Sequence, residues 1–155
     1  MAKRNLSAEV LTALAGKRLA TAESLTGGGI GQALTAVSGA SAVYAGGVIC
    51  YTNEVKNKVL GVPVEILERH GAVSMWTAGY MAGGVRKLLN ADVAVSVTGL
   101  AGPGGDEFGN PVGTVFIGYE SNAKSIARKC RFEGTREEIR EQTIEAALAL
   151  ILEMN

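Results

Sequence analysis

The chain has 155 residues, of which 47% are hydrophobic, so it can bury one substantial core but is short for two. We therefore predict a single domain over residues 1–155. Its 15 basic and 15 acidic residues cancel, which argues against nucleic acid as a partner, because phosphate backbones attract an excess of basic charge. With one histidine and two separated cysteines, zinc chemistry has too few ligands, and we expect neither a metal nor a cofactor.

The sequence also argues against a membrane partner. It has no run of about 18 uncharged apolar residues, and it opens with MAKRNLSAEV, a polar helix start with no apolar segment behind it. Neither a membrane span nor a signal peptide is therefore expected. Cys50 and Cys130 stand alone in apolar stretches, as buried thiols in a reducing compartment do, so we expect a cytoplasmic protein.

Helical and strand-like stretches alternate along the chain. A helix is expected where Leu6, Val10 and Leu14 recur four residues apart, with Asn5 or Ser7 as its cap. The other predicted elements are a strand over 18–23, a helix resuming at Ile30, a strand over 46–51, a helix after Asn53 as its cap and up to Gly61, a helix beginning at Pro63, a helix from its cap Ser74 to Leu89, strands over 92–98, 113–119 and 124–132, and a last helix with Thr135 and Glu138 as a capping box.

This alternation predicts the fold class. The segment DVAVSVT, residues 92–98, is apolar or small on both faces, as expected of a central strand that is covered on two sides. The last two strands are separated by only four residues and resemble a hairpin. We predict a three-layer α/β/α domain whose mixed sheet is mostly parallel and carries an antiparallel hairpin at one edge.

Three predicted strands end in residues that can do chemistry. The first ends at Ser24, the second at Tyr51, and the third at Thr98 and Gly99. Ligands of open α/β sheets bind outside the carboxyl ends of the strands. If these three strands are parallel neighbours, their ends should meet in one crevice.

The loop after the first strand, TAESLTGGG, has its own physical logic. Glycines remove the Cβ atoms between backbone and ligand, and the following helix offers free N–H groups, so we expect Thr26, Gly27 and Gly28 to contact a substrate. Those N–H groups would hold either an anion or the oxyanion formed when Ser24 attacks a carbonyl, and the sequence leaves both uses open. Glu23 should point to the opposite side of its strand and serve the structure.

Other catalytic signatures are missing or weak. The GGGIG segment is neither a dinucleotide fingerprint nor a P-loop, and no carboxylate cluster is available for magnesium, which disfavours a phosphotransferase. No GxSxG elbow occurs, and Ser24 has no lysine three residues on. A serine triad would have to recruit His70 with Asp92 or Asp106, which we keep only as a minor alternative.

Five blocks occur in order along the chain: TAESLTGGG, YTNEVK, LERHGAVS, VTGLAGPGG with the following PVGTV, and FEGTR. Together they resemble the C-terminal domain of the competence/damage-inducible protein CinA. The family includes stand-alone nicotinamide mononucleotide amidohydrolases. The resemblance therefore implies metal-independent hydrolysis of the carboxamide of nicotinamide mononucleotide, giving nicotinic acid mononucleotide and ammonia in pyridine nucleotide recycling.

The resemblance also implies roles for particular residues. Ser24 would be the nucleophile, Lys56 its proton acceptor and Tyr51 a hydroxyl relay. The nucleotide would be bound by the GxAGP loop and by an arginine that holds the phosphate, which correspond here to Thr98, Gly99, Gly102, Pro103 and Arg136.

Two positions depart from the usual pattern of the family. Leu25 stands where many relatives have cysteine, and Thr135 where they have aspartate. Neither should perform the chemistry, but Leu25 changes the wall of the pocket and Thr135 changes how Arg136 is held.

A serine–lysine mechanism makes a physical demand, because lysine accepts a proton only when it is neutral. The pKa of free lysine is about 10.4, whereas an efficient base at neutral pH needs one near 7 to 8, so Lys56 should be buried or beside another cation. The alternative to an enzyme is a catalytically silent nucleotide-binding or interaction module. The glycine-rich and apolar helix surfaces further suggest a homo-oligomer.

Overall fold

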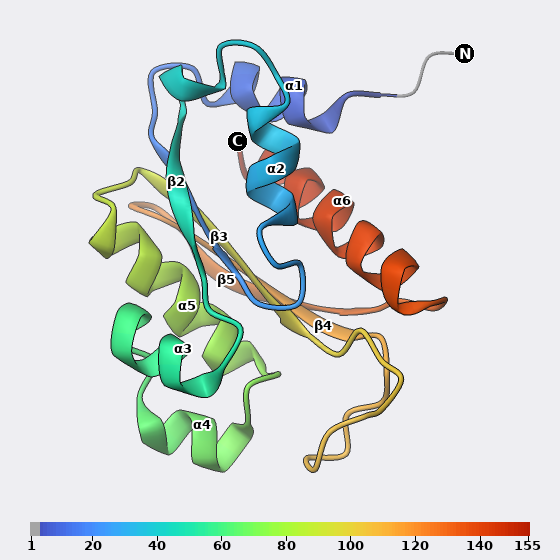
Figure 1. Cartoon of the computed structure of the whole chain (residues 1–155). Coiled ribbons are helices and arrows are strands. Elements are labelled where there is room, and N and C mark those ends of the chain that lie inside the picture. Colours follow the sequence, from blue (N-terminus) through green and yellow to red (C-terminus); the bar gives the residue numbers. More distant parts are fainter. Residues whose placement is uncertain (1–3) are drawn as a thin grey trace.

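The computed structural model describes residues 4–155, which contain one five-stranded sheet in the order β2-β1-β3-β4-β5 (Figure 1). The strands are β1 Leu19–Glu23, β2 Tyr44–Ile49, β3 Val93–Gly99, β4 Thr114–Ser121 and β5 Ser125–Arg131. The helices are α1 Leu6–Ala13, α2 Gly29–Thr35, α3 Asn53–Leu60, α4 Val64–His70, α5 Met75–Leu88 and α6 Arg136–Met154, with a short 3₁₀ turn η1 at Ala40–Ala42.

The predicted mixed sheet is confirmed. Strands β2, β1 and β3 run parallel, while β4 and β5 form an antiparallel hairpin that ends the sheet. Strand β3 lies at the centre and is buried from Val93 to Thr98, as its apolar pattern on both faces predicts.

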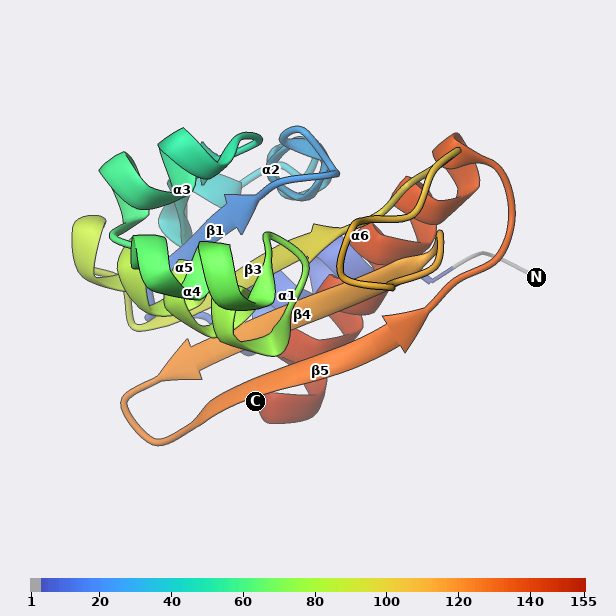
Figure 2. The same cartoon turned by 90° about the horizontal axis from the view of Figure 1, so that it is seen from below.

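Helices cover the sheet on both faces, which makes the predicted three layers (Figures 1 and 2). Helices α1, α2 and α6 pack together on one face, where the main core gathers side chains such as Leu34, Val95 and Ile151. Helix α5 lies along the other face with α3 and α4 outside it, over a core that includes Ala22, Met81 and Val85. Small side chains on this face of β1, Ala20 and Ala22, let α5 approach the sheet closely.

Most helix starts follow the predicted caps. Asn5 and Ser74 accept backbone hydrogen bonds at the starts of α1 and α5, and Thr135 with Glu138 forms the predicted capping box of α6. One cap was predicted wrongly, because Thr52 rather than Asn53 is the N-cap of α3. The extended backbone of Thr52 lets its hydroxyl accept from the Val55 N–H, and Asn53 becomes the first helical residue.

Two glycines of α5 offer a matched test of close packing. A Cβ on Gly84 would lie 2.1 Å from the carbonyl oxygen of Leu60, whereas a Cβ on Gly79 would meet nothing within 4 Å. We expect Gly84→Ala to lower the free energy of unfolding by about 2 kcal/mol or more, because the backbone of α3 must move. Gly79→Ala should instead raise it by about 0.5 to 1 kcal/mol, since alanine favours helix. Urea unfolding of both variants measures the difference, and equal effects would contradict this packing.

Candidate active site

The carboxyl ends of β2, β1 and β3 meet at one edge of the sheet, as the sequence predicts for parallel neighbours. Ser24 follows β1 directly, Tyr51 follows β2, and Thr98 and Gly99 end β3. Together they border a cleft of about 320 Å³. The lining residues are Ser24, Leu25, Tyr51, Lys56, Ala72, Val73, Thr98, Gly99, Leu100, Ala101, Gly102, Gly104 and Arg136.

Ser24 and Lys56 form a direct pair inside this cleft. The Lys56 Nζ and the Ser24 Oγ lie 3.0 Å apart, within hydrogen-bonding distance. Ser24 is 7% exposed and Lys56 only 1%, although lysine is rarely fully buried without an ionic partner. Helix α3 brings the amine there, because Lys56 occupies the inner side of the helix while Lys58 points to solvent.

The surroundings of Lys56 favour its neutral form. Burial lowers the pKa of its ammonium group below the ordinary lysine value, and only the nearby Cys50 thiol opposes this shift. Within residues 4–155 no carboxylate lies at ion-pair distance from its amine. The shift is in the direction that a general base requires.

The hydrogen bonds of Lys56 also suit a neutral amine. In addition to its contact with the Ser24 Oγ, the Lys56 Nζ donates to the carbonyl oxygens of Cys50 at 2.7 Å and Tyr51 at 3.3 Å. A neutral amine has two N–H groups and one lone pair. The two carbonyls can take the two N–H groups, which leaves the lone pair to accept the proton of the Ser24 hydroxyl.

The mouth of the cleft is formed by Tyr51 and Arg136. Tyr51 is 61% exposed, and its hydroxyl accepts a hydrogen bond from Arg136 Nη2 at 3.3 Å. Arg136 Nη1 donates to the Gly102 carbonyl at 2.6 Å, so neither of these two bonds is to an acidic group. The Tyr51 hydroxyl has no hydrogen bond to Ser24 or Lys56 within the described part of the chain, and its relay role stays a prediction.

The other predicted site residues divide into two groups. Thr98, Gly99 and Gly102 line the cleft, and the Thr98 hydroxyl donates to the Ala72 carbonyl at 2.7 Å. The lining does not include Pro103, Thr26, Gly27 or Gly28. Contact between these four residues and a substrate stays a prediction.

The Glu23 carboxylate binds the N–H groups at the start of α2, where an external anion would otherwise bind. This carboxylate is 2% exposed and accepts from the Thr26 hydroxyl at 2.6 Å, from Ile30 N–H at 2.8 Å and from Gly31 N–H at 3.0 Å. The positive end of α2 is thereby satisfied from within the chain. The sequence-based expectation that these N–H groups await an external anion is corrected, while the structural role expected for Glu23 is supported.

Several residues of the cleft wall were not predicted from the sequence. Ala72, Val73, Leu100, Ala101 and Gly104 line it, although no role was assigned to them. Ala72 and Val73 belong to the LERHGAVS block and Leu100 and Ala101 to the GLAGP loop, so membership in these blocks was the available signal. The side chains of Ala72, Val73, Leu100 and Ala101 make this part of the wall apolar.

The alternative catalytic triad has no geometric support. His70 does not line the cleft, and its ring stacks on Trp76 with centroids 3.8 Å apart. Asp92 accepts from the Arg18 backbone N–H, and Asp106 organises its own loop by accepting from Phe108 and Asn110.

Within residues 4–155, no three histidine, cysteine or acidic side chains are grouped so that they could hold a metal ion. None of the helices in that range has the length and apolar character needed to cross a bilayer.

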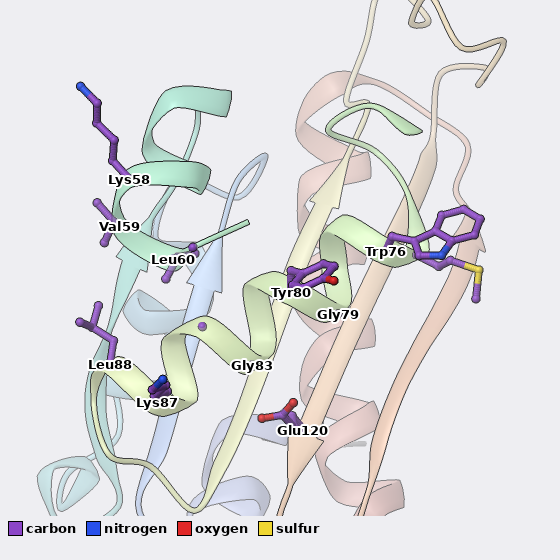
Figure 3. A pocket seen from close by; sticks show the side chains of 13 residues that line it. Lys58, Val59, Leu60, Trp76, Gly79, Tyr80, Gly83, Lys87, Leu88 and Glu120 are labelled. Atoms are coloured by element: carbon purple, nitrogen blue, oxygen red, sulfur yellow. The ribbon is translucent and has the colours of Figure 1, made fainter. Parts of the chain in front are cut away.

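A larger hollow of about 920 Å³ lies on the outer surface of α3 and α5 (Figure 3). Exposed apolar side chains border it, among them Trp76, Tyr80 and Leu88. It contains neither Ser24 nor Lys56, so its greater size does not make it the candidate active site. A homo-oligomer stays a prediction.

The fold and the site together define an α/β domain with a buried serine–lysine pair at the carboxyl ends of three parallel strands. The sequence profile of the CinA C-terminal domain matches residues 3–155. The chain therefore belongs to the CinA C-terminal domain family.

Individual relatives agree with this assignment. A CinA-like protein of Parasynechococcus marenigrum is 53% identical over 115 residues, which are 73% of this chain and 27% of the relative. A CinA-like protein of Thermosynechococcus vestitus is 51% identical over 119 residues, 76% of this chain and 29% of the relative. The chain thus spans about a third or less of the length of the curated relatives it matches.

Solved structures match the whole chain. A CinA superfamily protein from Escherichia coli has a TM-score of 0.96 at 33% identity, covering 100% of this chain and 94% of the other. A competence/damage inducible protein from Agrobacterium tumefaciens has a TM-score of 0.94 at 38% identity, covering 100% and 98%.

Proposed function

We propose that the protein hydrolyses the carboxamide of nicotinamide mononucleotide to nicotinic acid mononucleotide and ammonia, as part of pyridine nucleotide recycling in the cytoplasm. The observation that carries the proposal is the 3.0 Å contact between the Ser24 hydroxyl and a buried Lys56 amine whose pKa is lowered by burial. A module that only binds nucleotides has no need to bury a lysine against a serine, because burying an amine costs free energy.

In the first half of the reaction, the neutral Lys56 amine takes the Ser24 proton while Oγ bonds to the carboxamide carbon. The carbonyl electrons move to the oxygen and form a tetrahedral oxyanion. When the oxyanion collapses, the carbon–nitrogen bond breaks and Lys56 returns the proton to the departing nitrogen. Ammonia leaves and the pyridine carboxyl group remains as an ester of Ser24. We expect the Tyr51 hydroxyl to relay this proton once substrate displaces its bond with Arg136.

In the second half, water attacks the ester and gives a proton to Lys56. The bond between the carbonyl carbon and Ser24 Oγ breaks, and Lys56 returns the proton to Oγ. The product is the acid, which ionises at neutral pH, and the pair is restored. No metal is needed, because the base and the nucleophile are both side chains of this chain.

Arg136 suits the phosphate of the substrate. It lies in the first turn of α6, where a cation is disfavoured by the helix dipole, and it borders the mouth of the cleft. A phosphate there would be stabilised by the guanidinium and by the positive end of the helix. The apolar cleft wall would then hold the pyridine ring between Arg136 and Ser24.

We expect Arg136→Met to raise KM for nicotinamide mononucleotide about 10- to 100-fold, because a hydrogen bond to a charged group contributes about 1.5 to 3 kcal/mol. Its kcat should change little, since the reacting carboxamide lies at the other end of the substrate. Steady-state kinetics of ammonia release measure both. Arg131→Met, an exposed arginine of β5, is the matched control, and an unchanged KM in Arg136→Met would remove Arg136 from the site.

The direct test is to incubate the purified chain with nicotinamide mononucleotide and to measure ammonia and nicotinic acid mononucleotide together. Equal amounts of both products are expected. If the nucleotide binds but neither product appears, the chain is a silent binding module and the proposed activity is wrong.

A further inference from the structure

Arg140, in the second turn of α6, ties that helix to the loop that carries the nucleophile. Its Nε donates to the Leu25 carbonyl at 2.9 Å and its Nη2 to the Thr26 carbonyl at 3.2 Å. Leu25 and Thr26 directly follow Ser24, and they lie more than a hundred positions before Arg140 in the sequence. The side chain of Arg140 is only partly buried, yet both hydrogen bonds point inward to this loop.

The loop is held through three consecutive carbonyl groups. The Ser24 carbonyl accepts from Gly27 N–H at 3.1 Å, the Leu25 carbonyl from Arg140, and the Thr26 carbonyl from both Arg140 and Gly29 N–H. In a trans peptide the N–H points opposite to the carbonyl of the same peptide unit. Fixing the first two carbonyls therefore fixes the directions of the Leu25 and Thr26 N–H groups.

Most other N–H groups of this segment are already used. Those of Ile30 and Gly31 donate to the Glu23 carboxylate, and that of Ser24 donates to Val97. Within residues 4–155, the N–H groups of Leu25, Thr26 and Gly28 have no acceptor. Of these three residues, Leu25 lines the cleft beside Ser24. Thr26 is not among the lining residues but directly follows Leu25, whereas Gly28 lies against Ile49.

We infer that the Leu25 and Thr26 N–H groups form the oxyanion hole of this site, and that Arg140 is the positioning residue of their loop. Through the Leu25 carbonyl, Arg140 fixes the direction of the Thr26 N–H. Through the Thr26 carbonyl it fixes the Gly27 N–H, which donates to the Ser24 carbonyl and so holds the Leu25 N–H. This inference rests on the proposed amidohydrolase function, and it replaces the helix N–H groups of α2 as the donors. Arg140 itself does not touch the substrate. Its guanidinium fork is required, because two carbonyls of successive peptides must be held at once.

The test is a kinetic comparison of Arg140→Lys and Arg140→Gln with the wild type. Each should lower kcat for nicotinamide mononucleotide about 10²- to 10³-fold, the usual effect of losing one oxyanion donor, with KM changed less than about threefold. The apparent pKa of the pH–rate profile should stay unchanged, because Arg140 does not contact Lys56. Arg128→Lys, an exposed arginine of β5 paired with Glu153, is the matched control and should retain wild-type kcat.

A second variant separates positioning from general stability. Arg140→Ala removes the fork, and added guanidinium ion at millimolar concentration should restore part of its kcat. A kcat within tenfold of the wild type in Arg140→Lys, a shifted apparent pKa, or a loss confined to KM would each overturn the inference while the amidohydrolase stands. No ammonia from the wild type would remove the proposed function and this inference with it.

Discussion

Replacing Ser24 with alanine is expected to lower kcat for nicotinamide mononucleotide by about 10⁴-fold or more, because removal of a nucleophile leaves only the binding and electrostatic parts of catalysis. The fold should persist, since the change removes one hydroxyl at the end of β1 and leaves the hydrogen bonds of Glu23 to the start of α2 intact. The dissociation constant of the substrate should change less than about threefold. Ammonia release and calorimetric binding measure the two effects.

Ser41→Ala is the matched control for that variant, because Ser41 is an exposed serine in the η1 turn. It should behave as the wild type does. If Ser24→Ala retained wild-type kcat, Ser24 would not be the nucleophile, and a water molecule activated by Lys56 would have to attack the carboxamide directly.

Replacing Lys56 with methionine is expected to lower kcat about 10³- to 10⁴-fold, because the Ser24 hydroxyl then has no base. Lys58→Met is the matched control on the same helix, since Lys58 is exposed and pairs with Glu54. Only the buried lysine should matter. Equal losses in the two variants would indicate a general effect of charge removal from α3.

Lys56 also makes a prediction about stability that does not depend on substrate. Its pKa is lower in the folded chain than in the unfolded chain, so between these two values the unfolded chain binds more protons. The cost of burying the ammonium is present in full below the folded pKa and disappears as pH rises past the unfolded pKa. Urea unfolding should therefore show the wild type gaining stability relative to Lys56→Met as pH rises through that window.

Much of the fold could be predicted because its local signals agree with its packing. The alternating elements, the doubly covered strand β3 and the capping box at Thr135 all appear in the printed sequence and in the structure. The error at Asn53 arose because both Thr52 and Asn53 can cap a helix, and only the backbone dihedral angles distinguish them.

The site was less predictable, because its supporting contacts join distant parts of the chain. The contacts of Glu23 with Thr26, Ile30 and Gly31 are close in sequence, but the carboxylate lies five residues before the Gly28 N-cap of α2, where no usual capping pattern places an acceptor. No sequence pattern distinguishes Arg140 from the other charged residues of α6. Its hydrogen bond to the Leu25 carbonyl forms only because α6 packs beside the loop after β1. The position of Lys56 was predictable from its block, whereas its burial followed only from the pKa that the mechanism demands, because the surrounding segment of sequence is polar.

The central claim is that a neutral Lys56 amine takes the proton of Ser24. The pH dependence of kcat/KM for nicotinamide mononucleotide tests it most directly. We predict a rise with pH through an apparent pKa below the ordinary lysine value of about 10.4, followed by a plateau, and no such rise in the residual activity of Lys56→Met. A profile that is flat up to pH 10, or a rise that persists in Lys56→Met, would contradict the account.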